Sequence, residues 1–520
     1  MISGKALLHR AIEAHKAGHR DTADALYRQT VQAVPNHAAA RHWYGLLLKD
    51  SGDLVGAAEQ LETAAALAPG DIAARFNLGS VYFDQRRYED SLSLFRHCVA
   101  AKPDLVVGWR NIGMALLALY RPEEALAALE RGLATGHADG PLYFQFGNAF
   151  LMMGGYARAI GAYRQALALE PVNFDAWNNL SSALLFSRQI EAAESALKRA
   201  VEIEPDNHNA LMGLSHLHLL RGDYDVGWKL HDHRLETRET LLENFRAFGP
   251  PSWKGEPLEG RTLLLYDEQG FGDAIQFVRY LPLVAEAGGP VVFAVRPGLM
   301  KLFSGLARVS LVSTEEPLPH FDLHCPLMSL PRFYGPNSSV APPSAPYLRA
   351  DEALVRQWRA RLGRDRKVGL CWAGNPTHSR DRERSLTLER LRPLLDLPGV
   401  CWFAVQKELK PADRELLDKL QGKLTPLGEA LKDWTDTAAA LSALDLLITV
   451  DTSVAHLAGA LGRPTWLMLS AIPDWRWLLA RDDTPWYPSM RLFRQSAPGD
   501  WAGVVENISA ALTGLKHPVP

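Results

Sequence analysis

The chain has 520 residues, of which 47% are hydrophobic and 22% charged, and its formal net charge is -3. This length exceeds one hydrophobic core and predicts several domains, while the weak charge gives no basis for nucleic-acid binding. The four cysteines show no C-x-x-C spacing, which argues against a disulfide framework or a zinc site. We see no signal peptide and no apolar run of roughly 18 to 20 residues, and therefore expect a soluble, cytoplasmic protein.

The first half is periodic. Its units share a large residue, an aliphatic-Gly pair and an Ala-x-x-x-large motif, as in Trp109 to Leu129. A 34-residue unit of this kind is typical of tetratricopeptide repeats, in which a small residue lets two helices approach and proline ends the second. We predict an α-solenoid over residues 1–235, with six repeats and a partial capping repeat. The prolines that mark the period, all 34 or 68 residues apart, are Pro35, Pro69, Pro103, Pro171 and Pro205.

Four carboxamides occupy one position in successive repeats: Asn77, Asn111, Gln145 and Asn179. We expect this position to face the concave groove of the superhelix. Carboxamides donate to and accept from the backbone of an extended peptide, so the ladder predicts binding of a protein acceptor. The alternative is that asparagine serves local solubility and helix pairing there.

Other polar residues of this half are ambiguous by themselves. Asp223 and Asp225 have the spacing of a metal-binding DxD pair but lie in the turn of a repeat, so we interpret them as turn residues. His208 and His216 are interpreted as surface or packing residues rather than ligands.

A linker is predicted at 236–260, where the period is lost and Pro and Gly accumulate. Beyond it, short apolar runs alternate with amphipathic stretches, a pattern that favours parallel strands with crossover helices. We predict an α/β unit of two Rossmann-like lobes, 261–345 and 346–520, with a cleft between them. The candidate strands are 262–267, 290–295, 308–313, 367–373, 401–406, 445–450 and 464–469.

The first predicted strand of this unit runs into Gly270, Gly272 and Asp273. Glycines at a strand-to-helix turn let backbone and ligand approach closely. An aspartate at a helix start is also a common N-cap. We favour a ligand site, because open α/β sheets bind ligands at the carboxyl ends of their strands.

A second corner follows the strand at 445–450, with Asp451, Thr452, Ser453 and His456. Hydroxyls and free N–H groups at a helix N-terminus suit a diphosphate. Each of these residues could instead be a helix cap or a core residue, but their occurrence together after an apolar strand favours a ligand site. The tryptophan-rich stretch at 474–487 fits either the wall of a donor pocket or the core.

Between the corners, Asn375 follows the strand at 367–373 and precedes a charged loop that contains Arg380 and Arg384. Such a cationic loop is suited to neutralise a phosphate leaving group, or is simply solvated. Gln406 and Lys407, at the end of the next strand, are weaker candidates for the same role.

The motifs G-F-G-D at 270–273 and D-T-S-V-A-H-L-A-G-A-L-G-R-P at 451–464 resemble those of ADP-heptose:lipopolysaccharide heptosyltransferase-type GT-B glycosyltransferases. The resemblance covers most of residues 261–515. It implies an inverting mechanism without metal and a nucleotide-sugar as co-substrate, bound by the C-terminal lobe, with no further cofactor.

The same resemblance assigns roles to residues. Asp273 would be the general base, while Arg384 would stand where the family often has a leaving-group lysine. Thr452, Ser453 and His456 would hold the donor phosphates. The residues expected around the donor are Gly270, Gly272, Asn375, Arg384, Gln406, Lys407, Asp451, Thr452, Ser453 and His456.

A fusion of tetratricopeptide repeats to a GT-B unit is similar in plan to protein O-GlcNAc transferases and bacterial flagellin glycosyltransferases, in which the repeats engage the protein substrate. We therefore expect transfer to a protein, plausibly to Ser or Thr of flagellin or a similar protein. Alternatives are a lipopolysaccharide or saccharide glycosyltransferase whose repeats bind a partner, and a non-catalytic scaffold. A nicotinamide enzyme is disfavoured, because Arg296 stands where an acidic ribose ligand is expected.

Overall fold

The computed structural model divides the chain into two units, residues 1–205 and 206–520. Each unit is described by itself. The residues that the structure describes are 4–236, 248–334, 345–363, 365–378, 380–420 and 422–514. Much of the predicted linker, 237–247, therefore lies outside the described residues.

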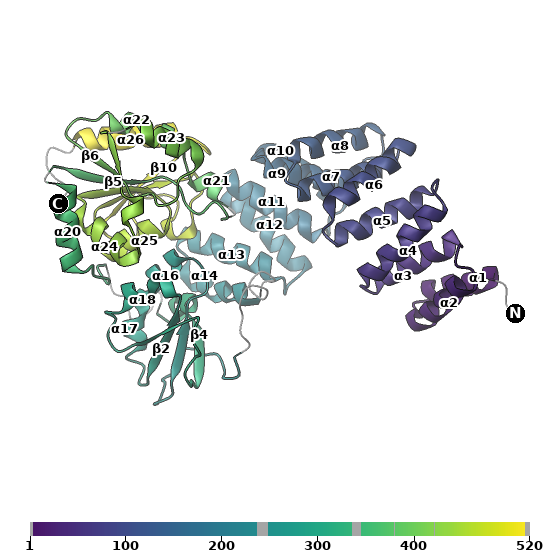
Figure 1. Ribbon diagram of the computed structural model, residues 1–520, viewed down its shortest axis with the longest axis horizontal. Coiled ribbons are helices and arrows are strands. Elements are labelled where there is room, and N and C mark those ends of the chain that lie inside the picture. The colour runs from purple at the N-terminus through teal and green to yellow at the C-terminus, as the bar shows by residue number, and fades with distance from the viewer. Residues whose placement is uncertain are drawn as a thin grey trace. The chain divides into compact units, whose positions relative to one another are not determined.

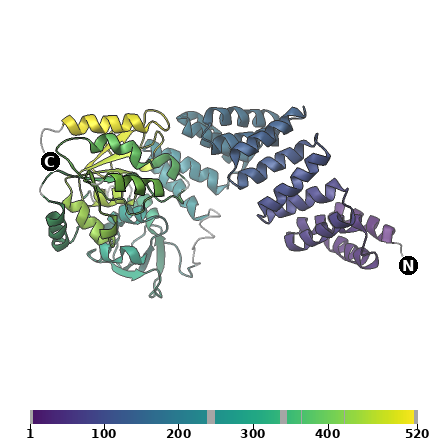
Figure 2. The same cartoon turned by 45° about the horizontal axis from the view of Figure 1, so that its top comes forward.

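The first unit is a row of antiparallel helix pairs, one pair for each 34-residue repeat (Figure 1). Figure 2 shows the same pairs from a second direction. The prediction of an α-solenoid built from such repeats is confirmed for this part of the chain. The pairs are α1 (Gly4–Lys16) with α2 (Arg20–Ala33), α3 (Ala38–Asp50) with α4 (Leu54–Leu67), α5 (Ile72–Asp84) with α6 (Tyr88–Ala101), α7 (Val106–Ala118) with α8 (Pro122–Ala134), α9 (Gly140–Met152) with α10 (Tyr156–Leu169), and α11 (Phe174–Phe186) with α12 (Ile190–Ile203).

The repeat residues explain the pairing. A Cβ added at Gly113 would lie 2.7 Å from Leu129, and one at Gly147 would lie 2.3 Å from Tyr163. Only glycine therefore fits where the two helices of a pair approach most closely. Five of the second helices end two residues before a proline of the series. Where the series lacks its proline, the left-handed Gly136 (φ 82°) turns the chain after α8.

The second unit begins with a seventh helix pair, α13 (His208–Arg221) and α14 (Tyr224–His231), followed by the short helix η1 (Asp232–Glu236). The division of the chain thus falls about thirty residues before the predicted domain boundary at residue 235. The reason is side-chain packing. Trp228 of α14 is only 3% exposed, and its ring meets Phe277 at 6.0 Å and Trp475 at 5.1 Å, both in the α/β part.

The smaller of the two sheets is parallel, with strand order β3-β2-β1-β4. This sheet carries a small buried apolar cluster of Leu264, Tyr266, Val292 and Ala294. The strand order reverses between β1 and β4, so the loops that follow these two strands lie beside each other. The strands are β1 (Leu263–Tyr266), β2 (Val291–Val295), β3 (Ser310–Ser313) and β4 (Leu323–Pro326).

The larger sheet is also parallel, with order β10-β9-β8-β5-β6-β7. If β5 to β10 are renumbered 1 to 6 and the sheet is read from β7, the order is 3-2-1-4-5-6. This is the doubly wound arrangement, and its switch point lies between β5 and β8. Figure 2 shows the yellow helix α26 (Trp501–Gly514) outside this sheet. The strands are β5 (Lys367–Cys371), β6 (Cys401–Ala404), β7 (Leu424–Pro426), β8 (Leu446–Val450), β9 (Thr465–Leu469) and β10 (Met490–Arg494).

All seven predicted strands correspond to strands of the structure, whereas β4, β7 and β10 were not predicted. β7 has only three residues, and β4 contains a histidine and a proline. β10 lies at the edge of its sheet and carries two arginines, so it lacks the continuous apolar run of a central strand.

Two further features bear on the sequence-based expectations. All four cysteines are free thiols. Within the part of the chain that the structure describes, no helix combines the length and apolarity needed to cross a membrane.

Helices between the strands complete the second unit. They are α16 (Phe271–Phe277), η2 (Val278–Tyr280), α17 (Leu281–Val284), α18 (Pro297–Phe303), η3 (Leu327–Ser329), α19 (Leu330–Tyr334), α20 (Glu352–Leu362), α21 (Asp381–Arg384), α22 (Leu388–Leu395), α23 (Pro411–Lys419), η4 (Gly428–Ala430), α24 (Trp434–Ala443), α25 (Ser453–Ala460), η5 (Trp475–Trp477) and α26.

Candidate functional site

The two predicted strand-to-helix corners lie against each other. α16 follows β1 in the smaller lobe, and α25 follows β8 in the larger lobe. A Cβ added at Gly272 would lie 2.8 Å from Cδ2 of His456 and 3.5 Å from Cα of Ser453. The first of these distances is too short for any side chain, so the contact between the lobes requires glycine at this point.

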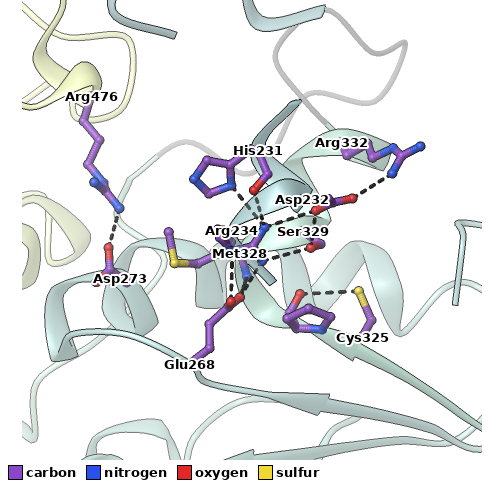
Figure 3. A network of polar contacts seen from close by, with 11 residues as sticks. His231, Asp232, Arg234, Glu268, Asp273, Cys325, Met328, Ser329, Arg332 and Arg476 are labelled. Carbon is purple, nitrogen blue, oxygen red and sulfur yellow. Dashed lines mark hydrogen bonds and ion pairs between the residues drawn. The ribbon is translucent and has the colours of Figure 1, made fainter. Parts of the chain in front are cut away.

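The carboxylate of Asp273 lies at this junction. Its Oδ2 accepts a hydrogen bond from the Gly270 amide at 2.8 Å, which caps α16. Its Oδ1 forms an ion pair with Arg476 (Figure 3). The Asp273 side chain keeps 19% of its surface exposed, so it is reachable from solvent while both oxygens are held.

A pocket opens near this junction, at the switch point of the larger sheet. Ligands of open α/β sheets bind at such a point, outside the carboxyl ends of the strands. The pocket combines cationic and acidic side chains. The residues that line it are His378, Arg380, Glu383, Arg384, Asp451, Met468, Leu469, Ser470, Pro473 and Asp474.

Asp451 enters the pocket directly after β8. Burial, together with repulsion from Asp474, raises the pKa of Asp451 to about 6, although Arg476 and Arg384 oppose the shift. Arg384 also donates from Nη1 to the backbone carbonyl of Asp451 at 3.1 Å. The guanidinium predicted to face a leaving group is thus anchored next to the corner of the larger lobe.

His456 is buried behind the same corner. Burial and the nearby guanidinium of Arg476 lower the pKa of His456 to about 3, so the ring is neutral at ordinary pH. Its Nδ1 lies 2.9 Å from the Tyr487 hydroxyl, and its ring stacks on Trp477 at 5.4 Å. Trp477 and Tyr487 are fully buried, which places them in the core rather than on a pocket wall.

The hydroxyl residues of this corner lie at the start of α25. Thr452 is its N-cap residue and Ser453 its first helical residue. The Thr452 hydroxyl is buried beside the Cys371 thiol. A hydroxyl at a helix N-terminus is suited to a phosphate oxygen.

Of the predicted donor residues, only Arg384 and Asp451 line the pocket. Asn375 uses its side-chain oxygen within its own loop, accepting from the amide of Thr377 at 3.0 Å. Gln406 is buried and ties two strand ends together: its oxygen accepts from the Ala373 amide at 3.0 Å and its nitrogen donates to the Ala373 carbonyl at 3.0 Å. Lys407 is exposed. Gln406 therefore serves the fold, and the proposed donor contacts of these three residues stay predictions.

His216 of α13 was interpreted from the sequence as a surface or packing residue. It is exposed, whereas Leu214 and Leu217 beside it are buried. Surrounding protein nevertheless desolvates the ring and lowers the pKa of His216, with Arg476 acting in the same direction and Asp474 opposing. The last helix pair thus contributes a polar side chain near the site. The spacing of the repeat alone carries no signal for this.

A buried polar network fixes the turn that precedes Asp273. Figure 3 shows Arg234 at its centre. Arg234 donates through Nε and Nη2 to the two carboxylate oxygens of Glu268 at 2.9 and 2.6 Å. Ser329 accepts from Arg234 at 2.9 Å and donates to Asp232 at 2.6 Å. Because Glu268 belongs to the β1–α16 turn, this network ties η1 to the corner that carries Asp273.

The carboxamide ladder of the first unit is partly paired within the protein. Asn179 donates to Asn148 at 3.0 Å, and Asn148 donates to Gln145 at 3.2 Å. The Asn77 amide lies 2.7 Å from His42. Asn111 is partly buried. Peptide binding by the ladder therefore stays a prediction.

The structure also bears on the aspartate pair at 223 and 225 and on metal binding. Asp223 caps α14 and lies 2.8 Å from His218, in agreement with its interpretation as a turn residue. Over the described ranges, no group of three or more His, Cys, Asp or Glu side chains is arranged to hold a metal ion.

Known proteins resemble both halves of the chain to different degrees. Protein FlbA of Caulobacter vibrioides is 27% identical over 536 residues, which covers 97% of this chain and 89% of the relative. The Hsp70-Hsp90 organizing protein of Triticum aestivum is 32% identical over 95 residues, 18% of this chain and 16% of its own length. A solved tetratricopeptide repeat protein from Parabacteroides merdae covers 46% of this chain and 94% of its own, with 13% identity and a TM-score of 0.40.

Family descriptions agree with the periodicity of the first half. Two families described as "Tetratricopeptide repeat" match this chain, one at residues 150–217 and the other at 8–72, 46–106 and 76–141. The matches extend into α13, the first helix of the second unit. The chain is therefore a tetratricopeptide-repeat array that continues into a unit with two parallel sheets.

Proposed function

We propose that the protein is an inverting GT-B-type glycosyltransferase that moves a sugar from a nucleotide-sugar donor to a hydroxyl group of a protein. The observation that carries this proposal is the junction of the two corners, where Gly272 lies against His456 and Asp273 is joined through Arg476 to Asp474 of the pocket lining. A base from one lobe and an anion-binding helix start from the other are the parts that such a transfer needs.

The proposed reaction is a single displacement at the anomeric carbon of the sugar. The acceptor oxygen forms a bond to this carbon while the bond to the nucleotide phosphate breaks and its electron pair leaves with the phosphate. Asp273 takes the proton of the acceptor hydroxyl. Arg380 and Arg384, which line the pocket, and the N-terminus of α25 would offset the charge that develops on the leaving group. With these groups in that role, the proposal requires no metal and no cofactor.

The acceptor is proposed from the repeats. Tetratricopeptide superhelices offer extended concave surfaces to protein partners, and the carboxamide ladder is suited to peptide backbone. The relative FlbA matches nearly the whole chain, so the combination of repeats and α/β unit is shared with at least one other protein. A serine or threonine of flagellin or a similar protein is the proposed class of acceptor, in the cytoplasm.

Two measurements test this function. A thermal-shift screen with UDP-, GDP-, ADP- and CMP-sugars should identify a donor, since a ligand at 100 times its Kd stabilises by roughly 2.7 kcal/mol. Intact-mass analysis of co-expressed candidate acceptors should then show the mass of one added sugar, and Asp273→Asn should abolish it. Donor binding without modification of any protein would redirect the proposal to a saccharide acceptor. The absence of both would leave a non-catalytic scaffold.

A further inference from the structure

Arg476 of η5 is a buried arginine that lies close to Asp273. Its side chain is 8% exposed and lies outside the pocket lining, although its partner Asp474 lines the pocket. The guanidinium donates to Asp273, to Gln276 and, at 2.9 Å, to Asp474. The guanidinium carbon Cζ also lies 4.3 Å from the centre of the Trp475 ring. Four groups thus surround one buried cation.

These partners come from both lobes. Asp273 and Gln276 lie on α16 of the smaller lobe, whereas Asp474 and Trp475 lie in or beside η5 of the larger lobe. A planar guanidinium has five N–H donors in a rigid fork, so it can serve several acceptors in fixed directions at once. Arg476 is therefore a charged link between the lobes that ends on the proposed base.

We propose that Arg476 is the positioning residue for Asp273 and fixes the direction in which this carboxylate faces an acceptor hydroxyl. The inference rests on the proposed function of Asp273 as the general base. The carboxylate is held at two points: Arg476 binds Oδ1, and the Gly270 amide binds Oδ2 at 2.8 Å. With both oxygens held, the plane of the carboxylate is fixed, and its remaining lone pairs point in set directions.

The geometry separates this role from donor binding. Arg476 does not line the pocket, so its loss should act on the chemical step more than on the donor. A displacement of about 1 Å in a reacting group costs about 10²-fold in rate. Lysine keeps the charge but presents it as a single point on a flexible stem, and it cannot reproduce the fork.

The test compares Arg476→Lys and Arg476→Gln with a matched control in the same part of the chain. The control is the double variant Arg481→Gln with Asp483→Asn, which removes an exposed bidentate ion pair that touches nothing in the site. Because Arg476→Gln leaves the half-buried Asp474 without its partner, thermal unfolding checks the folding of each variant. Arg476→Lys, which keeps the charge, is the decisive variant.

Two readouts are expected to change together. With a nucleotide-sugar donor and a hydroxyl acceptor, kcat of Arg476→Lys should fall about 10²-fold, while KM for the donor stays within about threefold. Hydrogen exchange of the amides at 270–277 should accelerate about tenfold, since the cap between Gly270 and Asp273 loses its anchor. The control variant should match the wild type in both.

The outcomes also separate this inference from the proposed function. If Asp273→Asn abolishes transfer while Arg476→Lys keeps wild-type kcat and exchange, the positioning role is overturned and the base is not. If Asp273→Asn transfers sugar normally, the proposed base itself is wrong. If the wild type transfers no sugar, the exchange measurement decides alone: unchanged exchange at 270–277 in a folded Arg476→Lys overturns the link to Asp273.

Discussion

At the scale of single residues, Gly272 marks a close approach of the two lobes. Its Cβ would lie 2.8 Å from the ring of His456, which is buried and has little room to move. We expect Gly272→Ala to lower the free energy of unfolding of the second unit by about 1–3 kcal/mol through overpacking. Urea unfolding of the variant measures this.

A matched glycine gives the control for this substitution. A Cβ at Gly298 of α18 would lie 3.5 Å from the Phe271 ring, an ordinary contact. Gly298→Ala should therefore leave the free energy of unfolding unchanged or slightly higher. Equal losses at Gly272 and Gly298 would show that the close approach of the two corners does not exist in solution.

His456 predicts a pH dependence of stability. Its pKa falls from 6.5 to about 3 on folding, so the unfolded chain binds one more proton between these values. Stability therefore rises with pH across this window, by at most about 1.4 kcal/mol per pH unit. In His456→Gln this contribution disappears. Asp451, whose raised pKa acts in the opposite direction between 3.8 and about 6, is present in both proteins.

The measurement for His456 is urea unfolding of the wild type and His456→Gln at pH 5.0, 6.0 and 7.5. The difference in free energy between the two proteins should grow in favour of the wild type as the pH rises. A difference that stays constant over this range would mean that the imidazole titrates with the same pKa in the folded and the unfolded protein.

Residue patterns predicted some parts of the site and not others. Asp273 and the corner at 451–456 follow apolar strands, and the carboxyl ends of parallel strands converge, so sequence reasoning could anticipate that they meet. Arg476 and His216 carry no such signal, because their positions depend on how η5 and α13 pack. Gln406 shows that a polar residue after a strand can also bond to the fold: its side chain bonds the backbone of Ala373, and its predicted donor contact stays a prediction.

At the scale of elements, α14 braces both lobes. Trp228 packs edge-on against Phe277 of the smaller lobe and Trp475 of the larger lobe. We expect Trp228→Ala to lower the free energy of unfolding of the second unit by about 3–5 kcal/mol and to accelerate hydrogen exchange in both α16 and η5. Hydrogen-exchange mass spectrometry resolves the two segments.

Val226, on the same helix and 39% exposed, is the control for Trp228. Val226→Ala should change the free energy of unfolding by no more than about 0.5 kcal/mol. If Trp228→Ala loosened only one of the two lobes, α14 would be a cover for that lobe and not a brace between them.

The period of 34 residues predicted the helix pairs well, since each repeat has the same internal contacts. It could not predict where the array stops being an independent unit. Trp228 lies in α14, where a large buried side chain is ordinary for a repeat, and Arg234 lies in the short helix η1. That these two pack against the α/β part is a property of the tertiary fold, and it explains why the two units divide at residue 205 although the helix pairs continue to His231.

At the scale of the whole molecule, the division after Pro205 predicts how the chain can be cut. A protein that begins at Asp206 keeps α13, α14 and the Arg234–Glu268 network. One that begins at residue 237 follows the boundary of the repeats but loses Trp228 and Arg234. We expect the first to fold and to bind the donor nucleotide with nearly the Kd of the full chain, and the second to fail in both.

The same pair of proteins tests what the repeats do. If residues 1–205 recruit the acceptor, the protein that begins at Asp206 should bind nucleotide normally but modify the protein acceptor about 10²-fold less efficiently, because it loses the high local concentration that tethering gives. Thermal shift with nucleotide and intact-mass analysis of the acceptor measure the two properties. Modification at the rate of the full chain would show that the α/β unit with α13 and α14 recognises the acceptor alone, and that the repeats bind another partner.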